Sequence, residues 1–250
     1  MSPPPRPPFS SLPLDKNGPA GNAWGLYGKD DELGALHMLT PSVVQSAASE
    51  IQSGQRVPLD WSLNLPTFPS FDRPAFDWRM EIRRHPNGDK RVVNDDFLNI
   101  NTQSSSQWDG FRHYGYQQAG KFYGGRTQQE LEESEVIGTE KIVNAGGITT
   151  RGVILDYPRW LEKKGKEKVH ALSANSIKVE DLKDMLKETG VKTRDGDLLL
   201  LRTGFTRDYE SLGTEERKAL ATKPPTFLGV ESSKAVLQWI WESGFAAVAG

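Results

Sequence analysis

The fold class of this chain follows first from one apolar run, Leu198-Leu199-Leu200-Leu201-Arg202-Thr203-Gly204. Four consecutive leucines followed by polar residues and a glycine predict a buried strand. Upstream, Val179 to Thr189 carries apolar residues at helical spacing and is followed by Gly190, which predicts an amphipathic helix. Thr150 to Tyr157 is another apolar run and predicts a second buried strand. This alternation of strands and helices indicates an α/β fold.

Other segments carry the sequence signals of a helix start, a helix end, or the apolar period of a helix or strand. Thr40-Pro41 is a helix start, because threonine caps a helix and proline suits its first position; this helix is predicted from Pro41 to Ser53, before Gly54. Further helices are predicted at Thr127 to Ser134, Thr214 to Ala221 and Glu231 to Ser243, and strands at Arg56 to Leu65, Trp78 to Arg84, Val92 to Ile100 and Phe245 to Gly250. His85 to Asp89 is predicted to be an exposed turn between two of these strands.

Two irregular regions stand out. Residues 1–20 form a proline-rich arm, for which we expect a poorly ordered leader or, alternatively, an arm that wraps a partner subunit. Residues 21–250 are predicted to form a single domain. Within it, Pro66 to Trp78 is a long loop that could act as a lid carrying Phe68, Phe71 and Phe76, or could pack those rings against its own core.

Composition restricts the classes of function. The 250 residues are 36% hydrophobic and 26% charged, which is typical of a globular protein. A net charge of −2 gives no electrostatic case for binding nucleic acid or anionic membranes. The chain has no cysteine, which excludes disulfides, thiolate nucleophiles and cysteine-bound zinc. No apolar leader or membrane-length apolar run is visible, so we expect a cytoplasmic protein that does not enter membranes.

The segment Asn101 to Tyr116 gathers polar groups among aromatic residues. Gln103, Gln107, Asp109 and His113 follow one another at spacings of four, two and four. If Ser104 to Gln107 turns into a helix, these side chains share one face, because helical neighbours meet at three or four residues. A carboxylate and an imidazole in these positions could hold a metal ion, or one could act as a general base while the other orients it. The alternative is a polar loop, with Asp109 capping a helix and His113 hydrogen-bonded in the core.

Several segments together resemble the cyclase, or kynurenine formamidase-like, hydrolases, especially fungal members. The segments that carry this resemblance are Trp24-Gly25, Asp30-Asp31-Glu32-Leu33-Gly34, Leu39-Thr40-Pro41, Thr150 to Asp156, Gly196 to Gly204 and Gly229-Val230-Glu231. The resemblance implies a swivelling β/β/α-type fold with a mixed sheet flanked by helices. It also implies a C-terminally shortened chain, because no counterpart of the family's later His and Glu ligands follows.

The hallmark of that family is His-x-Gly-Thr-His-x-Asp-x-Pro-x-His, whose first two histidines and aspartate bind a divalent metal. Aligned to it, Gln103 and Gln107 replace the two histidines, Asp109 keeps the aspartate, and His113 keeps the catalytic histidine. An amide oxygen is a weak, hard ligand, so the resemblance implies either no metal or Mn²⁺ or Mg²⁺ in preference to Zn²⁺.

The resemblance implies hydrolysis of an amide or lactam C–N bond in a small molecule, as in arylformamidases. Asp109 and His113 would be catalytic, Gln103, Gln107 and Asp109 would be the metal positions, and Trp108, Phe111 and Tyr114 would shape the substrate pocket. A homo-oligomer, dimer or tetramer, is expected. Two alternatives stay open: a metal-independent isomerase, dehydratase or cyclase in secondary metabolism, and a non-catalytic shortened paralogue that completes its sheet from a partner subunit.

Overall fold

The centre of the protein is a parallel sheet of three strands. The computed structural model describes residues 3–224 and 226–250. In it, β3 (Gly152–Asp156), β5 (Leu198–Arg202) and β7 (Ala247–Ala249) lie in the order β3-β5-β7, so the leucine run is the central strand. Val153 pairs with Leu199, and Leu199 with Val248. Both predicted buried strands and the α/β class are confirmed.

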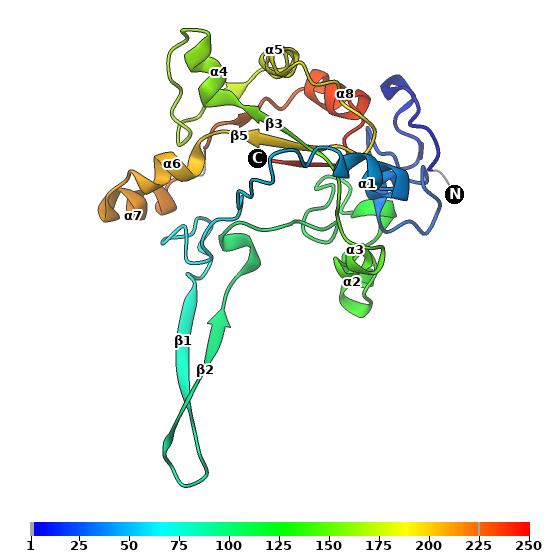
Figure 1. Cartoon of the computed structure of the whole chain (residues 1–250). Helices are drawn as coiled ribbons and strands as arrows, with labels where there is room; N and C mark the ends of the chain where they lie inside the picture. Colours follow the sequence, from blue (N-terminus) through cyan, green and yellow to red (C-terminus); the bar gives the residue numbers. More distant parts are fainter. Residues whose placement is uncertain (1–2, 225) are drawn as a thin grey trace.

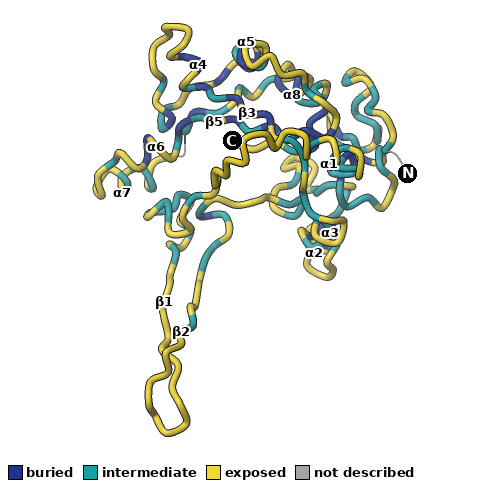
Figure 2. The backbone as a smooth tube through the Cα atoms, viewed as in Figure 1, coloured by how far each residue is buried: buried dark blue, intermediate teal, exposed yellow. Residues whose placement is uncertain are grey.

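Three helices cover one face of this sheet (Figure 1): α4 (Tyr157–Lys163), α5 (Val179–Thr189) and α8 (Lys234–Glu242). Side chains alternate along the strands, so Val153 and Leu155 are buried against the helices while Ile154 is 53% exposed on the opposite face. The core between sheet and helices contains Leu155, Tyr157, Trp160, Leu161, Ala171, Ile177, Val179, Leu182, Met185, Leu199, Leu201, Leu228, Val236, Trp239 and Phe245. These residues form the buried layer of Figure 2.

Smaller elements surround this core. After β5 come α6 (Phe205–Glu210) and α7 (Thr214–Thr222), and a two-stranded parallel sheet joins β4 (Ser176–Ile177) to β6 (Gly229–Val230). Before β3 come α1 (Pro41–Ala48), α2 (Gln128–Glu133) and α3 (Glu140–Asn144). Short 3₁₀ turns are η1 (Phe9–Ser11), η2 (Gly34–Met38), η3 (Thr102–Ser104) and η4 (Tyr123–Gly125).

A long antiparallel hairpin projects from this body (Figure 1). It consists of β1 (Asp77–Arg84) and β2 (Lys90–Asn99), joined by the predicted turn at His85–Asp89, where the His85 N–H donates to the carbonyl of Asp89. Parallel and antiparallel pairing therefore both occur, in separate sheets. Almost every residue of the two hairpin strands is exposed (Figure 2).

Three sequence-based expectations about these elements need correction. Arg56 to Leu65 is not a strand, because no strand among the described residues pairs with it. Val57, Leu59 and Leu63 are exposed, with Val57 at 73%, while Trp61 packs against Phe205 and Tyr209. α1 has the predicted Thr40 cap but ends at Ala48 rather than Ser53, and Ile51 beyond it is exposed. α8 begins at Lys234, not Glu231, because the Ser233 side chain caps it.

Three α-helices, α3, α4 and α6, were not predicted, and the arm differs from expectation. α4 begins directly at the end of β3, where the Asp156 side chain accepts from the Arg159 N–H. α6 follows β5 after Thr203 and Gly204, and no side chain caps it. The proline-rich arm lies against α8 in place of a loosely ordered leader: Arg6 donates to the Trp241 carbonyl over 2.9 Å, and the Trp241 indole donates to the Pro7 carbonyl over 2.8 Å. No helix in the described ranges is long and apolar enough to cross a membrane.

Candidate functional site

The hallmark segment begins where β2 of the hairpin ends. There, η3 is fixed by side chains that bond to their own backbone: Asn101 accepts from the Gln103 N–H, and the Ser104 hydroxyl donates to the Asn101 carbonyl. Ser104 is buried, and Ser105 returns to an extended conformation. Local side-chain hydrogen bonds of this kind compete with helix formation. The helix supposed to follow a turn at Ser104 to Gln107 therefore does not form, and the chain continues as an irregular polar loop, which was the alternative.

Three of the predicted site residues meet in this loop. The Gln103 amide donates to an Asp109 carboxylate oxygen over 2.6 Å, and the Gln107 amide donates to the Gln103 amide oxygen over 3.2 Å. The three side chains form a chain of hydrogen bonds that ends on the carboxylate. Asp109 and Gln107 are exposed and Gln103 is half-buried, so this cluster is open to solvent.

His113 is not bonded to this cluster. Its backbone N–H closes a turn onto the Gly110 carbonyl, and its ring lies 6.4 Å from the ring of Tyr114. Across residues 3–224 and 226–250, no hydrogen bond joins the His113 side chain to Asp109. The expected contact depended on a helical spacing of four, and that spacing is lost with the helix.

The three predicted pocket aromatics have different surroundings. Trp108 is 44% and Tyr114 is 73% exposed, so both rings are available to a bound molecule. Phe111 instead stacks on Tyr123 at a centroid distance of 4.1 Å. It also covers Gly34, where φ is +56° and an added Cβ would lie 2.7 Å from the Phe111 ring. Phe111 thus joins the hallmark loop to the N-terminal Asp-Asp-Glu-Leu-Gly segment.

The long loop after Leu65 reaches the same place. The Arg73 guanidinium donates to the Gln103 carbonyl over 2.9 Å and lies over the ring of Phe71 at 4.8 Å. The Ser105 hydroxyl donates to the Ser62 carbonyl over 3.2 Å. Phe71 itself is 63% exposed. The loop is therefore fixed beside the polar cluster through Arg73 rather than through an aromatic cover.

A second polar cluster lies on the other side of Phe111, around Asp31. One carboxylate oxygen of Asp31 lies 2.6 Å from His37 Nε2 and the other accepts from the Tyr123 hydroxyl over 2.5 Å. The N–H groups of Leu33 and Gly34 also donate to this carboxylate. Burial favours the neutral acid, but these hydrogen bonds outweigh it and lower the pKa of Asp31. Burial, and then the Asp31 carboxylate, raise the pKa of Tyr123.

Sequence reasoning missed this cluster. Asp31 belongs to one of the segments that carry the family resemblance. His37 belongs to none of them, and a lone histidine of this kind is usually packed in the core or lies on the surface. The six-residue separation fits neither a helix nor a strand period, and Tyr123 lies 92 residues from Asp31. Only the fold brings the three groups together.

The residues at the hallmark positions do not fit a tightly held metal ion. They offer one carboxylate and two neutral amides, and the Gln103 amide already donates a hydrogen bond to the carboxylate. Among the described residues, no group of three or more His, Cys, Asp or Glu side chains could hold a metal ion. The donor chemistry disfavours zinc most strongly, since zinc prefers imidazole and thiolate.

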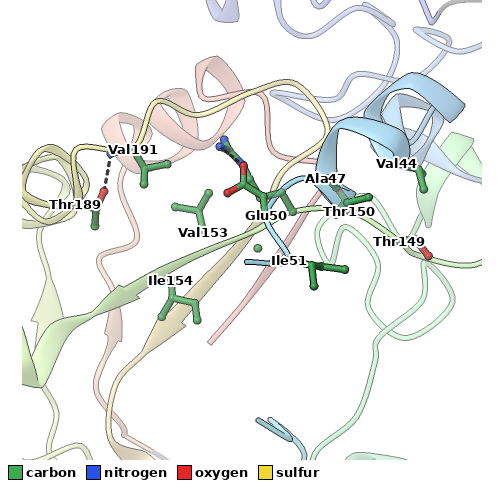
Figure 3. Close-up of a pocket in the computed structure, with 13 residues that line it drawn as sticks. Val44, Ala47, Glu50, Ile51, Thr149, Thr150, Val153, Ile154, Thr189 and Val191 are labelled. Atoms are coloured by element: carbon green, nitrogen blue, oxygen red, sulfur yellow. Dashed lines mark hydrogen bonds and ion pairs between the residues drawn. The ribbon is translucent and has the colours of Figure 1, made fainter. Parts of the chain in front are cut away.

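A well-formed cavity lies elsewhere (Figure 3). It measures about 500 Å³ and lies between the end of α1 and the outer edge of β3, with Ile51, Val153 and Ile154 on its apolar wall. Glu50 and Arg151 at its rim form an ion pair of 3.4 Å. None of the residues predicted for the site lines it. The hallmark loop is thus a surface site rather than the wall of this cavity.

Comparison with known proteins agrees with the fold and with the family resemblance. The model of the Cyclase family, described as "Putative cyclase", matches residues 37–250. A crystal structure described as that of a novel cyclase is similar over 90% of this chain and 75% of the other, with a TM-score of 0.77 and 26% sequence identity. No curated protein matches. The family match covers most of the chain, and the chain therefore belongs to the Cyclase family.

Proposed function

We propose that this protein is an enzyme that hydrolyses the C–N bond of a small amide or lactam, in the manner of arylformamidases. One observation carries the proposal: in a chain of the Cyclase family, the hydrogen-bonded cluster of Gln103, Gln107 and Asp109 occupies the hallmark positions. Trp108, which lies between Gln107 and Asp109 in the chain, exposes its ring, as does Tyr114, and exposed rings suit an aromatic substrate.

The proposed chemistry uses side chains of this chain alone. Asp109 accepts a proton from water, whose oxygen attacks the carbonyl carbon of the substrate. The amide N–H groups of Gln107 and Gln103 donate to the oxyanion that forms. The C–N bond then breaks, and His113 supplies the proton that the departing nitrogen needs. Because His113 and Asp109 are not hydrogen-bonded to each other, each can act at a different atom of the substrate.

A second candidate is a metal-independent isomerase, dehydratase or cyclase that acts on a secondary metabolite. The Gln103–Asp109 hydrogen bond of 2.6 Å favours it, because an amide that orients a carboxylate suits proton abstraction next to a carbonyl. The Gln107 amide would then stabilise an enolate. The products separate the two reactions, since hydrolysis adds the elements of water and releases an amine or ring-opened acid.

The test is turnover of N-formylkynurenine and of a panel of aryl lactams by the purified chain. Asp109→Asn is expected to lower kcat/KM by about 10²–10⁴-fold, since it removes the general base. The matched control is Asp60→Asn, an exposed aspartate outside the site, which should leave turnover unchanged. Undiminished turnover by Asp109→Asn would refute the assigned chemistry, and isomerised or dehydrated products would favour the second candidate.

A further inference from the structure

Arg73 reaches the hallmark loop because the hairpin brings two distant segments to one place. Asp77 pairs with Asn99 at the base of the hairpin, so the residues just before Asp77 lie beside the residues just after Asn99. There the Arg73 guanidinium donates to the Gln103 carbonyl over 2.9 Å. Figure 1 shows both segments at the end of the hairpin that joins the body. Strand pairing therefore places a positive charge beside the hydrogen-bonded cluster that ends on Asp109.

The side chain of Arg73 is held in a defined position. It is half-buried, and its guanidinium lies over the ring of Phe71 at 4.8 Å while one N–H group donates to the Gln103 carbonyl. Pro74 follows Arg73 in the chain and restricts its backbone to extended conformations. A guanidinium fixed in this way loses little conformational freedom when it binds a ligand.

The turn that precedes Arg73 is strained. The φ angle is +65° at Phe71 and +54° at Asp72, and neither residue is a glycine. Side chains with a Cβ rarely adopt this left-handed region, so two in succession persist only where surrounding contacts fix them. Backbone strain of this kind concentrates at ligand-binding segments. The strained turn therefore marks the position of Arg73 as a candidate binding position.

The charge of Arg73 has no carboxylate partner within the chain. Across residues 3–224 and 226–250, no ion pair joins its guanidinium to an acidic side chain, although Asp72 is its neighbour in sequence and Asp109 belongs to the adjacent cluster. Arg112, also in the hallmark segment, differs because its guanidinium donates to two carbonyls at the end of α2. Arg73 instead keeps N–H donors that no described residue uses.

A carboxylate is the ligand that completes this arrangement. A planar guanidinium binds a carboxylate through two parallel hydrogen bonds, which match it in both charge and geometry. A single negative charge suits one guanidinium flanked by Asp72 and Asp109 better than the double charge of a phosphate. Gln103 lies between the two groups, with its carbonyl on Arg73 and its amide on Asp109. A molecule that spans Gln103 can thus place a carboxylate at Arg73 and an amide carbonyl at Asp109.

We propose that Arg73 binds a carboxylate of the substrate and thereby selects carboxylate-bearing aryl amides or lactams over neutral ones. The reaction in this statement rests on the proposed function, whereas the anion site rests on the contacts of Arg73 alone. The carboxylate docks on the guanidinium, the aromatic ring lies toward Trp108, and the amide faces Asp109. Arg73 is thus a specificity-determining residue and takes no part in proton transfer.

A matched pair of substrates tests this proposal. N-formylanthranilate carries a carboxylate next to its formamide, and formanilide is the same molecule without the carboxylate. Their intrinsic reactivities differ, so the quantity compared is the ratio of their kcat/KM values in each variant relative to wild type. Arg73→Gln keeps an N–H donor for the Gln103 carbonyl but removes the charge, and should lower this ratio about tenfold, mainly through KM. Arg73→Lys keeps the charge without the planar fork and should lower it less.

Arg79→Gln is the matched control. Arg79 also lies over an aromatic ring, that of Phe97 at 3.9 Å, but it belongs to β1 and pairs with Glu81. Its substitution should leave the ratio as in wild type. An unchanged ratio in Arg73→Gln, with a circular dichroism spectrum like that of wild type, would overturn the proposal.

Binding measurements separate this proposal from the proposed hydrolysis. If the wild-type chain hydrolyses neither compound, both become stable ligands whose dissociation constants are measured by isothermal titration calorimetry. Tighter binding of N-formylanthranilate that is lost in Arg73→Gln and weakens with added salt would support the anion site while contradicting the hydrolysis. Hydrolysis with a ratio unaffected by Arg73→Gln would do the reverse. Binding of neither compound would count against both.

Discussion

At the scale of single residues, Asp31 shows how one carboxylate fixes several segments. Its two oxygens bind His37 and Tyr123, and the backbone N–H groups of Leu33 and Gly34 complete its shell. Its side chain is only 3% exposed, so few of these partners could be replaced by water. Because Tyr123 stacks on Phe111, Asp31 holds the hallmark loop through two successive contacts.

We predict that Asp31→Asn lowers the free energy of unfolding at pH 7 by about 2–3 kcal/mol, since hydrogen bonds to a charged group are lost or weakened. The folded-state pKa of Asp31 is below its ordinary value of 3.8, so its stabilisation is fully present above pH 3.8 and is lost as pH falls through the folded pKa. Urea denaturation at pH 7 and at pH values below 4 measures both effects.

The control for this prediction is Asp30→Asn. Asp30 is the neighbouring carboxylate, its side chain is 86% exposed, and its contact with Arg126 is 3.9 Å long. Its substitution should change stability by less than about 0.5 kcal/mol. Equal losses in the two variants, or an acid-unfolding profile of Asp31→Asn identical to wild type, would show that the Asp31 network does not stabilise the fold.

At the scale of elements, α5 carries the packing of the central sheet. Leu182 is fully buried on its inner face, between the sheet and α8. We predict that Leu182→Ala lowers the free energy of unfolding by about 2–5 kcal/mol, through lost burial and the cavity left behind. Lys183→Ala, one residue on and exposed, should stay within about 0.5 kcal/mol. Thermal unfolding of both variants gives the comparison, and similar melting temperatures would contradict this account of the core.

The elements that sequence alone could predict are those whose signals are local. β5 and α5 carry a full apolar run or helical period with a terminating glycine, and both were predicted with nearly their observed bounds. Arg56 to Leu65 shows the limit of this reasoning, because alternation predicts a strand but cannot supply the neighbouring strand. α4 was missed because it follows β3 without a loop, and the apolar run that predicts the strand ends at Tyr157, the first residue of α4.

The candidate site, like the fold, could be predicted from the sequence only where its signals are local. Gln103, Gln107 and Asp109 were identified from the hallmark alignment and do meet, although along an irregular loop rather than a helix. The contacts of Phe111 with Tyr123 and of Asp31 with His37 depend on segments distant in sequence or on irregular spacing, so no periodic pattern encodes them. Their prediction requires the fold.

At the scale of the whole molecule, the donor set of the hallmark loop predicts how metal ions affect the stability of the folded chain. A ligand that binds only the folded chain stabilises it in proportion to the logarithm of its concentration over its dissociation constant. Two amides and one carboxylate form a weak donor set, so Zn²⁺ or Mn²⁺ should leave the melting temperature of the wild-type chain unchanged, and prolonged dialysis against EDTA should leave it unchanged as well.

Restoring imidazole at both hallmark positions should reverse this. Because the three side chains already meet, Gln103→His with Gln107→His creates a His–His–Asp set on the existing loop. At a zinc concentration about 100 times the dissociation constant, binding adds about 2.7 kcal/mol, which for a chain of this size corresponds to a rise in melting temperature of about 5–10 °C. Gln103→His alone is the matched control and should respond weakly. Equal zinc stabilisation of the wild-type chain would show that its amides suffice as ligands, and no response of the double variant would show that the loop does not present the three positions to one ion.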